Sequence, residues 1–476
     1  MLQDFGDEGM FQRDAADWAQ QTFGDCELGD KRRTKRLVDV GMRMANQVGS
    51  SLSKCCEGDE AALVGSYRLL RNEEMKPDTI REGGFAATVR QAQGHALLLA
   101  VEDTTSVSYA HAVAAQLGST SSTPNAKRRG YQVHSVLLLD AESEQTVGLI
   151  EQTHWCRETS DHGKKHQRKQ RAYQDKESYK WERASIQVAA RLGDTMSRMI
   201  SVCDREADLY EYLSYKLQHD QRFVVRAKAD RRIRESESNL FEILEKESTH
   251  LCGYTVQVPQ RGGRPARRAR VSLRSVAVAV MPPAGSLAAS SPLQLNAVLA
   301  EEIDAPLEVE PLRWVLLTTE PVASAREALT VIRYYECRWR IEDYHKAWKS
   351  GVGVERQRFQ HPENLERMLA ITAFLAVRLL QLRESQYSPA DQEARTCDEV
   401  LSEDEWKILW VSTERCPLPP SIPSARWAYL ALARLGGFTD TKRTGRPGWE
   451  TLWHGWFRLQ ERLKGYQFSQ LALAEL

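Results

Sequence analysis

Two aspartates stand where an apolar, strand-like run gives way to polar residues. Asp103 closes the run in HALLLAVEDTT, and Asp204 closes the run in RMISVCDREAD. Carboxylates gathered at the ends of buried strands raise one another's pKa unless a cation neutralises them. Mg²⁺ and Mn²⁺ prefer such hard oxygen ligands and also bind the phosphate oxygens of substrates. The pair predicts a metal site acting on a phosphate ester, although an aspartate after a strand also commonly caps a turn.

A third acid lies among cations in the segment 334–350, YYECRWRIEDYHKAWKS. On a helix, which turns about 100° per residue, Glu342 shares one arc with Arg338, Lys346 and Lys349. The adjoining arc is apolar and consists of Tyr334, Cys337, Ile341, Tyr344 and Trp348. A continuous helix could therefore dock on a sheet, offer Glu342 as a third metal ligand and hold phosphates with its cations. The competing interpretation is a solvated, charged face.

Several neighbouring side chains have secondary roles in this interpretation. Strand alternation turns Glu102 away from the proposed ligands, and helix rotation does the same for Asp343. Glu206 and Asp208 could supplement the site or serve the fold. His345 lies near the charged arc of the predicted helix and is a candidate contact with the substrate.

The periodicity of apolar residues predicts three domains, at 1–76, 77–383 and 384–476. The first is helical, with Asp30 as an N-cap. The second begins with three strands, a helix and a strand–helix–strand unit, which predict an α/β domain with a mixed sheet. Further strand candidates at about 231–320 predict a β-rich insertion. The third domain starts with an acidic linker and continues as a tryptophan-rich helical tail.

Composition indicates a soluble globular protein with more than one domain. The chain has 476 residues, of which 42% are hydrophobic and 27% charged, and it lacks the run of about 18 apolar residues that a membrane span needs. The acidic start does not resemble a secretory signal. Nine cysteines without a CxxC pair favour reduced thiols in a cytoplasm over a disulfide framework or a zinc site.

The formal net charge is zero and therefore gives no indication of nucleic-acid binding. The distribution of the charged residues along the chain is more informative. Basic residues cluster at 31–36, 164–171 and 261–274, whereas acidic residues cluster at 301–310 and 384–405. Separate basic patches are expected where one face of a protein meets nucleic-acid phosphates. Each basic run taken alone could equally be a solubility feature.

The spacing Y-x2-R-x3-E-x6-K resembles the YREK signature of bacterial insertion-sequence DDE transposases. Tyr335, Arg338, Glu342 and Lys349 fill it. Other motifs resemble the Tn-five group of these enzymes and occur in the same order along the chain. They are DWAQQTFGDCELGDKRRTKRLVDV, AVEDTTSVSY, VHSVLLL, VCDREAD, RFVVR, RWRIEDYHKAWK and ARLGGFTDTKRTG. The likeness covers most of the chain, but the loop 161–175 and the insertion 231–300 depart from it.

The resemblance implies an RNase H-like catalytic domain with a β insertion, an N-terminal helical domain that binds transposon ends and a C-terminal dimerisation domain. It implies that Asp103, Asp204 and Glu342 form a DDE triad binding two divalent ions, Mg²⁺ or Mn²⁺. The expected activity is cut-and-paste transposition of double-stranded DNA by a homodimer bound to paired ends.

The resemblance also implies contacts with DNA. Trp314 matches a tryptophan that takes a flipped base, although a core tryptophan in a strand is the plainer interpretation. The other implied contacts are Arg33, Arg36, Arg226, Tyr335, Arg338, Lys346 and Lys349. Two alternatives stay open: a metal-dependent nuclease or resolvase on the same fold, and a catalytically silent DNA-binding relative.

Overall fold

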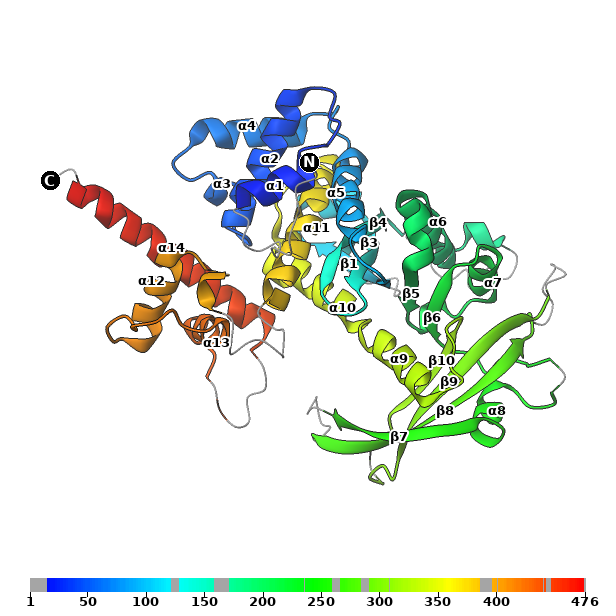
Figure 1. Ribbon diagram of the computed structural model, residues 1–476. Helices are drawn as coiled ribbons and strands as arrows, with labels where there is room; N and C mark the ends of the chain where they lie inside the picture. Colours follow the sequence, from blue (N-terminus) through cyan, green and yellow to red (C-terminus); the bar gives the residue numbers. More distant parts are fainter. Residues whose placement is uncertain are drawn as a thin grey trace, which may run out of the picture.

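The chain folds around one ten-stranded sheet, flanked by helices at both ends of the sequence (Figure 1). The computed structural model describes residues 15–120, 128–157, 171–234, 236–258, 266–283, 291–307, 309–385, 396–399, 401–439, 441 and 447–474. Within the described part of the chain, no helix combines the length and the apolar character needed to cross a membrane.

Five strands form the centre of the sheet. In spatial order they are β4 (Thr146–Trp155), β3 (Arg129–Asp140), β1 (Leu98–Tyr109), β5 (Met199–Cys203) and β6 (Arg222–Arg226). The first three are antiparallel neighbours, whereas β5 runs parallel to β1 and β6 runs parallel to β5. This order and these directions are those of an RNase H-like sheet, so the predicted mixed α/β fold is confirmed. A two-residue strand, β2 (Gly118–Ser119), also pairs with β3.

Helices cover both faces of the central strands, because β1 is apolar on both sides. Leu99 and Val101 belong to the largest core cluster, together with side chains of α11 (Pro362–Ser385). Leu98 and Ala100 pack instead with α6 (Lys180–Leu192). The face that includes Leu99 is therefore the one that meets α11. The remaining helices over the sheet are α5 (Pro77–Ala92) and α7 (Tyr210–Gln218).

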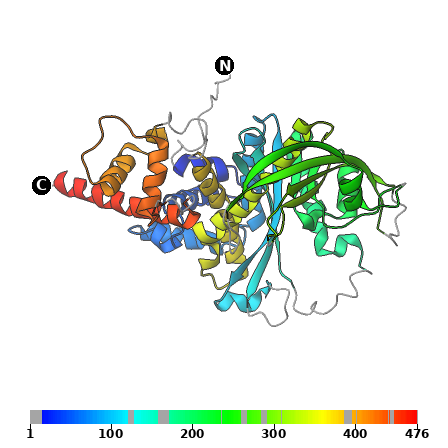
Figure 2. The same cartoon turned by 90° about the horizontal axis from the view of Figure 1, so that it is seen from below.

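The predicted β-rich insertion extends the central sheet. Its strands are β7 (Thr249–Val258), β8 (Arg267–Val280), β9 (Leu293–Ile303) and β10 (Arg313–Thr318), seen in green in Figure 2. They form an antiparallel series, and β10 pairs directly with β6. The insertion is thus part of the same sheet. It also contains a short helix that the periodicity did not indicate, α8 (Leu240–Lys246).

The N-terminal region is helical, as predicted. It contains α1 (Ala15–Phe23), α2 (Lys31–Asn46), α3 (Leu52–Cys55) and α4 (Glu60–Arg71). Asp30 caps α2 by accepting a hydrogen bond from the Arg32 N–H, which confirms the predicted N-cap. Arg367 of α11 is buried and donates to the backbone carbonyls of Leu70, at 2.9 Å, and Met75, at 2.6 Å. These bonds tie the end of α4 to α11, and so to the domain that contains the central sheet.

The single helix predicted over 334–350 is wrong. The structure has α9 (Ala325–Glu336), a turn, and α10 (Trp339–Lys346), followed by a π-helical turn at Ala347–Gly351. At the junction the N–H of Arg338 donates to the carbonyl of Tyr335, and the N–H of Arg340 donates to that of Cys337. Such bonds between residues three apart wind the chain more tightly than an α-helix. The predicted apolar stripe is nevertheless buried on both sides of the break.

The C-terminal region is a small helical unit with its own core, at the opposite end of the molecule from the insertion (Figure 1). It contains α12 (Glu403–Glu414), α13 (Ala425–Leu435) and α14 (Trp449–Ala474), as the tryptophan-rich pattern predicted. Gly436, just after α13, and Gly455 of α14 bring two backbones together, because a Cβ on either glycine would overlap the other segment.

Candidate active site

The register of two parallel strands places the predicted aspartates side by side. Val101 of β1 pairs with Val202 of β5, and Asp103 and Asp204 each follow two residues later in the same direction. Because side chains alternate along a strand, each aspartate lies on the face of its preceding valine. Both valines belong to the core cluster that meets α11. Two carboxylates therefore meet where the apolar core ends.

Helix α10 brings the third carboxylate to the same place. The Nη2 atom of Arg338 lies 2.7 Å from Oε1 of Glu342, and its Nη1 atom lies 3.6 Å from Oδ2 of Asp103. The Arg338 side chain is only 8% exposed, and its Cζ atom lies 5.0 Å from the ring centroid of Trp339. The guanidinium thus bridges an acid on the sheet and an acid on the helix.

The charges of the three carboxylates affect one another, as the pKa of Asp103 indicates. Burial raises the pKa of Asp103 to about 6, and the charges of Asp204 and Glu342 add to the rise. The Thr104 N–H, 2.7 Å from Oδ1 of Asp103, and the Arg338 guanidinium act in the opposite direction. Carboxylates that lie this close to one another favour the protonated form of Asp103.

This proton makes the stability of the metal-free protein depend on pH. Between about pH 4 and pH 6 the folded state retains a proton that the unfolded state releases, so stability falls as pH rises. Asp103→Asn removes the penalty and should raise the free energy of unfolding at pH 8 by up to about 3 kcal/mol. The gain should vanish near pH 4. Urea denaturation in EDTA measures it, and Asp343→Asn, at an acid paired with Arg383, should show no such gain.

The three acids do not form a closed ligand sphere in this structure. Among the described residues, no three of His, Cys, Asp and Glu are gathered closely enough to hold a metal ion. Their chemistry nevertheless suits a divalent cation, since all are hard oxygen donors. A positive group already lies between two of them, namely the Arg338 guanidinium.

A second cluster adjoins the acids. Tyr335 is buried, its ring centroid lies 5.7 Å from that of Trp314, and its hydroxyl contacts Arg226. Arg226 also donates to the carbonyl oxygen of Arg313 at 3.2 Å. Trp314 is half-buried on β10. The Tyr335 side chain is thus surrounded by other side chains of the protein and is not exposed to solvent. The predicted contacts of Tyr335, Arg226 and Trp314 with DNA remain predictions.

The remaining residues predicted on the charged helix differ in exposure. Lys346 is exposed and Lys349 is half-buried, on the π-helical turn. His345 is buried, with Nε2 3.4 Å from the Ser135 hydroxyl. Burial lowers its pKa to about 3, so it is neutral. His345 therefore packs against β3 in the interior of the protein. Its direct contact with the substrate remains a prediction.

The neighbouring acids have structural partners. Glu102 faces away from the ligands, within 3.5 Å of His134. Asp343 pairs with Arg383 at 3.0 Å, and Glu206 pairs with Lys180 at 3.2 Å. Asp208 is buried and binds the backbone N–H groups of Lys228 and Ala229 together with the Arg231 guanidinium. Asp208 therefore serves the fold.

A buried polar group beneath β1 was not predicted. Lys216 is fully buried and donates to the Ser201 hydroxyl at 2.8 Å, and burial lowers its pKa. His134 lies nearby on β3, with Nδ1 3.0 Å from the Thr104 hydroxyl. The available signals were a histidine inside the apolar strand QVHSVLLL and a lysine inside LSYKLQ. Lys216 thus contacts β5, the strand that precedes Asp204, and His134 contacts β1, the strand that carries Asp103.

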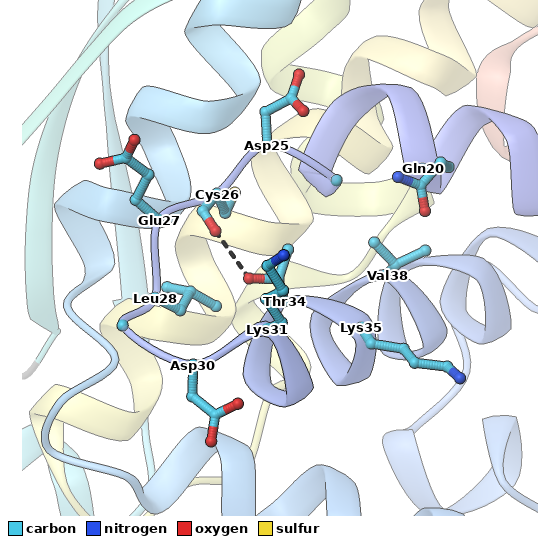
Figure 3. Close-up of a pocket in the computed structure, with 12 residues that line it drawn as sticks. Gln20, Asp25, Cys26, Glu27, Leu28, Asp30, Lys31, Thr34, Lys35 and Val38 are labelled. Carbon is cyan, nitrogen blue, oxygen red and sulfur yellow. Dashed lines mark hydrogen bonds between the residues drawn. The ribbon is translucent and has the colours of Figure 1, made fainter.

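The basic run at 31–36 lies on α2, beside a surface pocket of about 590 Å³ (Figure 3). Lys31 and Lys35 are exposed beside the pocket, and the Thr34 hydroxyl donates to the carbonyl of Cys26. Arg33 donates to the carbonyl of Leu28 at 2.9 Å, and Arg36 pairs with Asp39 at 3.1 Å. Both arginines remain half-exposed, and their contact with transposon-end DNA stays a prediction.

The other two basic runs are only partly described. All of 164–171 except its last residue lies outside the described residues, as does half of the acidic linker 384–405. In the run 261–274, Arg267 pairs with Glu302 and Arg270 pairs with Asp304, while Arg274 donates to a backbone carbonyl. Two arginines of this run, Arg267 and Arg270, are therefore paired with acids within the insertion.

Comparison with protein families identifies the family to which the chain belongs. A model described as a transposase DDE domain matches residues 129–378, and one described as transposase DNA-binding matches residues 15–75. The first match covers more than half of the chain. The chain belongs to the DDE transposases. The N-terminal helices of the transposase are accordingly its DNA-binding domain, and the sheet with α10 and α11 carries its DDE domain, a type of domain that generally uses divalent metal ions.

Proposed function

We propose that the protein is a cut-and-paste transposase of the YREK type, with Asp103, Asp204 and Glu342 as its catalytic triad. The observation that carries the proposal is the meeting of three carboxylates from separate parts of the chain. The β1–β5 register places two of them, and α10 supplies the third, joined to Asp103 through Arg338. The resemblance of the surrounding motifs to the Tn-five group supports the finer assignment.

The proposed reaction is a series of in-line displacements at phosphorus. Water attacks the phosphodiester at the transposon end, and the 3′ oxygen leaves as a free hydroxyl. That hydroxyl attacks the opposite strand, which forms a hairpin and releases the flanking DNA. A second water opens the hairpin, and the regained 3′-hydroxyl attacks target DNA. In each step one P–O bond forms and one breaks.

The three carboxylates would hold two divalent ions, Mg²⁺ or Mn²⁺. When bound, such a pair activates the attacking oxygen and stabilises the leaving oxygen. Asp103 and Asp204 share one ion in the proposal, and Glu342 binds the other. Arg338, Lys346 and Lys349 contact DNA phosphates.

The cluster beside the acids suits a strained DNA end. A tight hairpin is relieved when one base leaves the stack, and an aromatic ring offsets part of the unstacking cost. Trp314 is the proposed acceptor of that base, with Arg226 on a phosphate and Tyr335 holding both side chains. Arg33 and Arg36 would contact the transposon end from α2. We also propose that a homodimer pairs the two transposon ends through the C-terminal helices. The protein would act on nucleoid DNA in the cytoplasm.

The test uses purified protein, Mg²⁺ and short duplexes carrying the terminal repeats that flank its own gene. Denaturing gels follow nicking, hairpin formation and joining to a supercoiled plasmid. We expect all three products. Cleavage without hairpins or joining would instead indicate a metal-dependent nuclease or resolvase. Binding to the ends without any metal-dependent chemistry would indicate a silent DNA-binding relative.

A further inference from the structure

Arg338 holds a position between acids that the proposed function assigns to metal ions. Its guanidinium reaches both Glu342, at 2.7 Å, and Asp103, at 3.6 Å. Its Nε atom is buried and has no hydrogen-bond partner among the residues that the structure describes. A largely buried guanidinium with one unpaired N–H is costly unless acids compensate for it. The two carboxylates supply that compensation in the absence of any other charge.

The same contacts disfavour metal binding by these acids in their present arrangement. The hydrogen bond from Arg338 occupies part of the acceptor capacity of Glu342 Oε1, which makes that oxygen a weaker ligand for another cation. Two positive charges a few ångströms apart repel each other strongly in a partly buried site. The absence of a closed ligand sphere among the described residues accords with this.

We infer that Arg338 is an internal counter-ion that competes with the divalent metal until DNA arrives. A phosphodiester is the anion that can receive the guanidinium, because its oxygens match the same fork of donors. DNA binding would then move Arg338 from the carboxylates to a phosphate and free both acids for metal. Metal loading and DNA binding are in this way coupled, each favouring the other. The inference rests on the proposed metal-binding role of the acids.

The test measures Mn²⁺ binding. Electron paramagnetic resonance detects it as a decrease in the signal of free Mn²⁺. Without DNA, Arg338→Gln should bind Mn²⁺ about tenfold more tightly than the wild type, or better, because a competing charge is gone. Arg340→Gln is the matched control, since Arg340 lies on the same helix but faces Glu384 at 3.8 Å. An end duplex should tighten binding by the wild type more than binding by Arg338→Gln.

Equal or weaker Mn²⁺ binding by Arg338→Gln would overturn the inference while leaving the proposed function intact. Failure of every variant to bind Mn²⁺, with or without duplex, would overturn the proposed function itself. Addition of Asp204→Asn to Arg338→Gln should abolish the tight site, and persistence of that site would place the metal elsewhere. Circular dichroism checks folding. If Arg338→Gln does not fold, Arg338→Lys should show a smaller gain, because an ammonium group cannot bridge both acids as a planar fork does.

Discussion

Asp204→Asn and Glu342→Gln should each lower the rates of DNA cleavage and joining about 1,000-fold or more, while binding to transposon ends persists. Each substitution keeps the shape of the side chain but replaces an anionic metal ligand with a neutral amide. Asp204 follows β5 directly beside Asp103, and Glu342 faces the same pair from α10. Binding should survive because the DNA-binding domain at residues 15–75 is separate from these acids.

The measurement pairs denaturing gels for cleavage and joining with a mobility shift for binding. Asp343→Asn is the matched control, since Asp343 adjoins Glu342 in sequence yet pairs with Arg383. It should retain activity within a few-fold. Wild-type rates of cleavage in Asp204→Asn would exclude this triad, whatever the variant's affinity for DNA.

Gly455→Val should unfold the C-terminal helical unit and leave the catalytic domain folded. A Cβ at Gly455 would lie 1.8 Å from the carbonyl oxygen of Leu432, and one at Gly436 would lie 1.7 Å from that of Thr451. Both obstacles are backbone atoms, so no side chain can move aside. The helices would have to separate, at a cost of about 3 kcal/mol or more. The effect stays local because α12, α13 and α14 share a core of their own.

Hydrogen exchange over residues 425–474 and limited proteolysis would detect this unfolding. Gly465→Ala supplies the control on the same helix, since nothing lies within 4 Å of its Cβ position. That variant should be slightly more stable, by about 0.5–1 kcal/mol, because alanine loses less entropy in a helix. Protection of α14 in Gly455→Val equal to that in the wild type would contradict the expected separation.

The strand ends of the site could be predicted from sequence, because the apolar runs of β1 and β5 stop just before Asp103 and Asp204. The orientation of Glu102 followed from strand alternation. The place of Arg338 could not be predicted in the same way. A helical wheel assumes one continuous α-helix, whereas α9 ends at Glu336 and α10 begins at Trp339, after a more tightly wound turn. The contact between Arg338 and Asp103 depends on how α10 packs against β1, which the sequence pattern of one helix does not contain.

The fold shows the same division between local and long-range information. Periodicity indicated that both terminal regions are helical and located every long strand, since each pattern depends on neighbours in sequence. The pairing of β10 with β6 was not predictable, because it joins residues about ninety positions apart. Lys216 and His134 were missed for a similar reason. A polar residue inside an apolar pattern is recognisable only once its partner, such as Ser201 or Thr104, is known.

The return of β10 to the central sheet limits how this protein can be recombined with its relatives. Exchange of the whole segment between β6 and α9 would remove β10, which pairs with β6 on the side away from β5, and would leave an open sheet edge beside the acids. It would also remove Trp314. A chimaera that keeps β9 and β10 and replaces only the part around β7 and β8 preserves that edge. The transplantable unit is therefore smaller than the insertion, and its boundary lies inside the sheet.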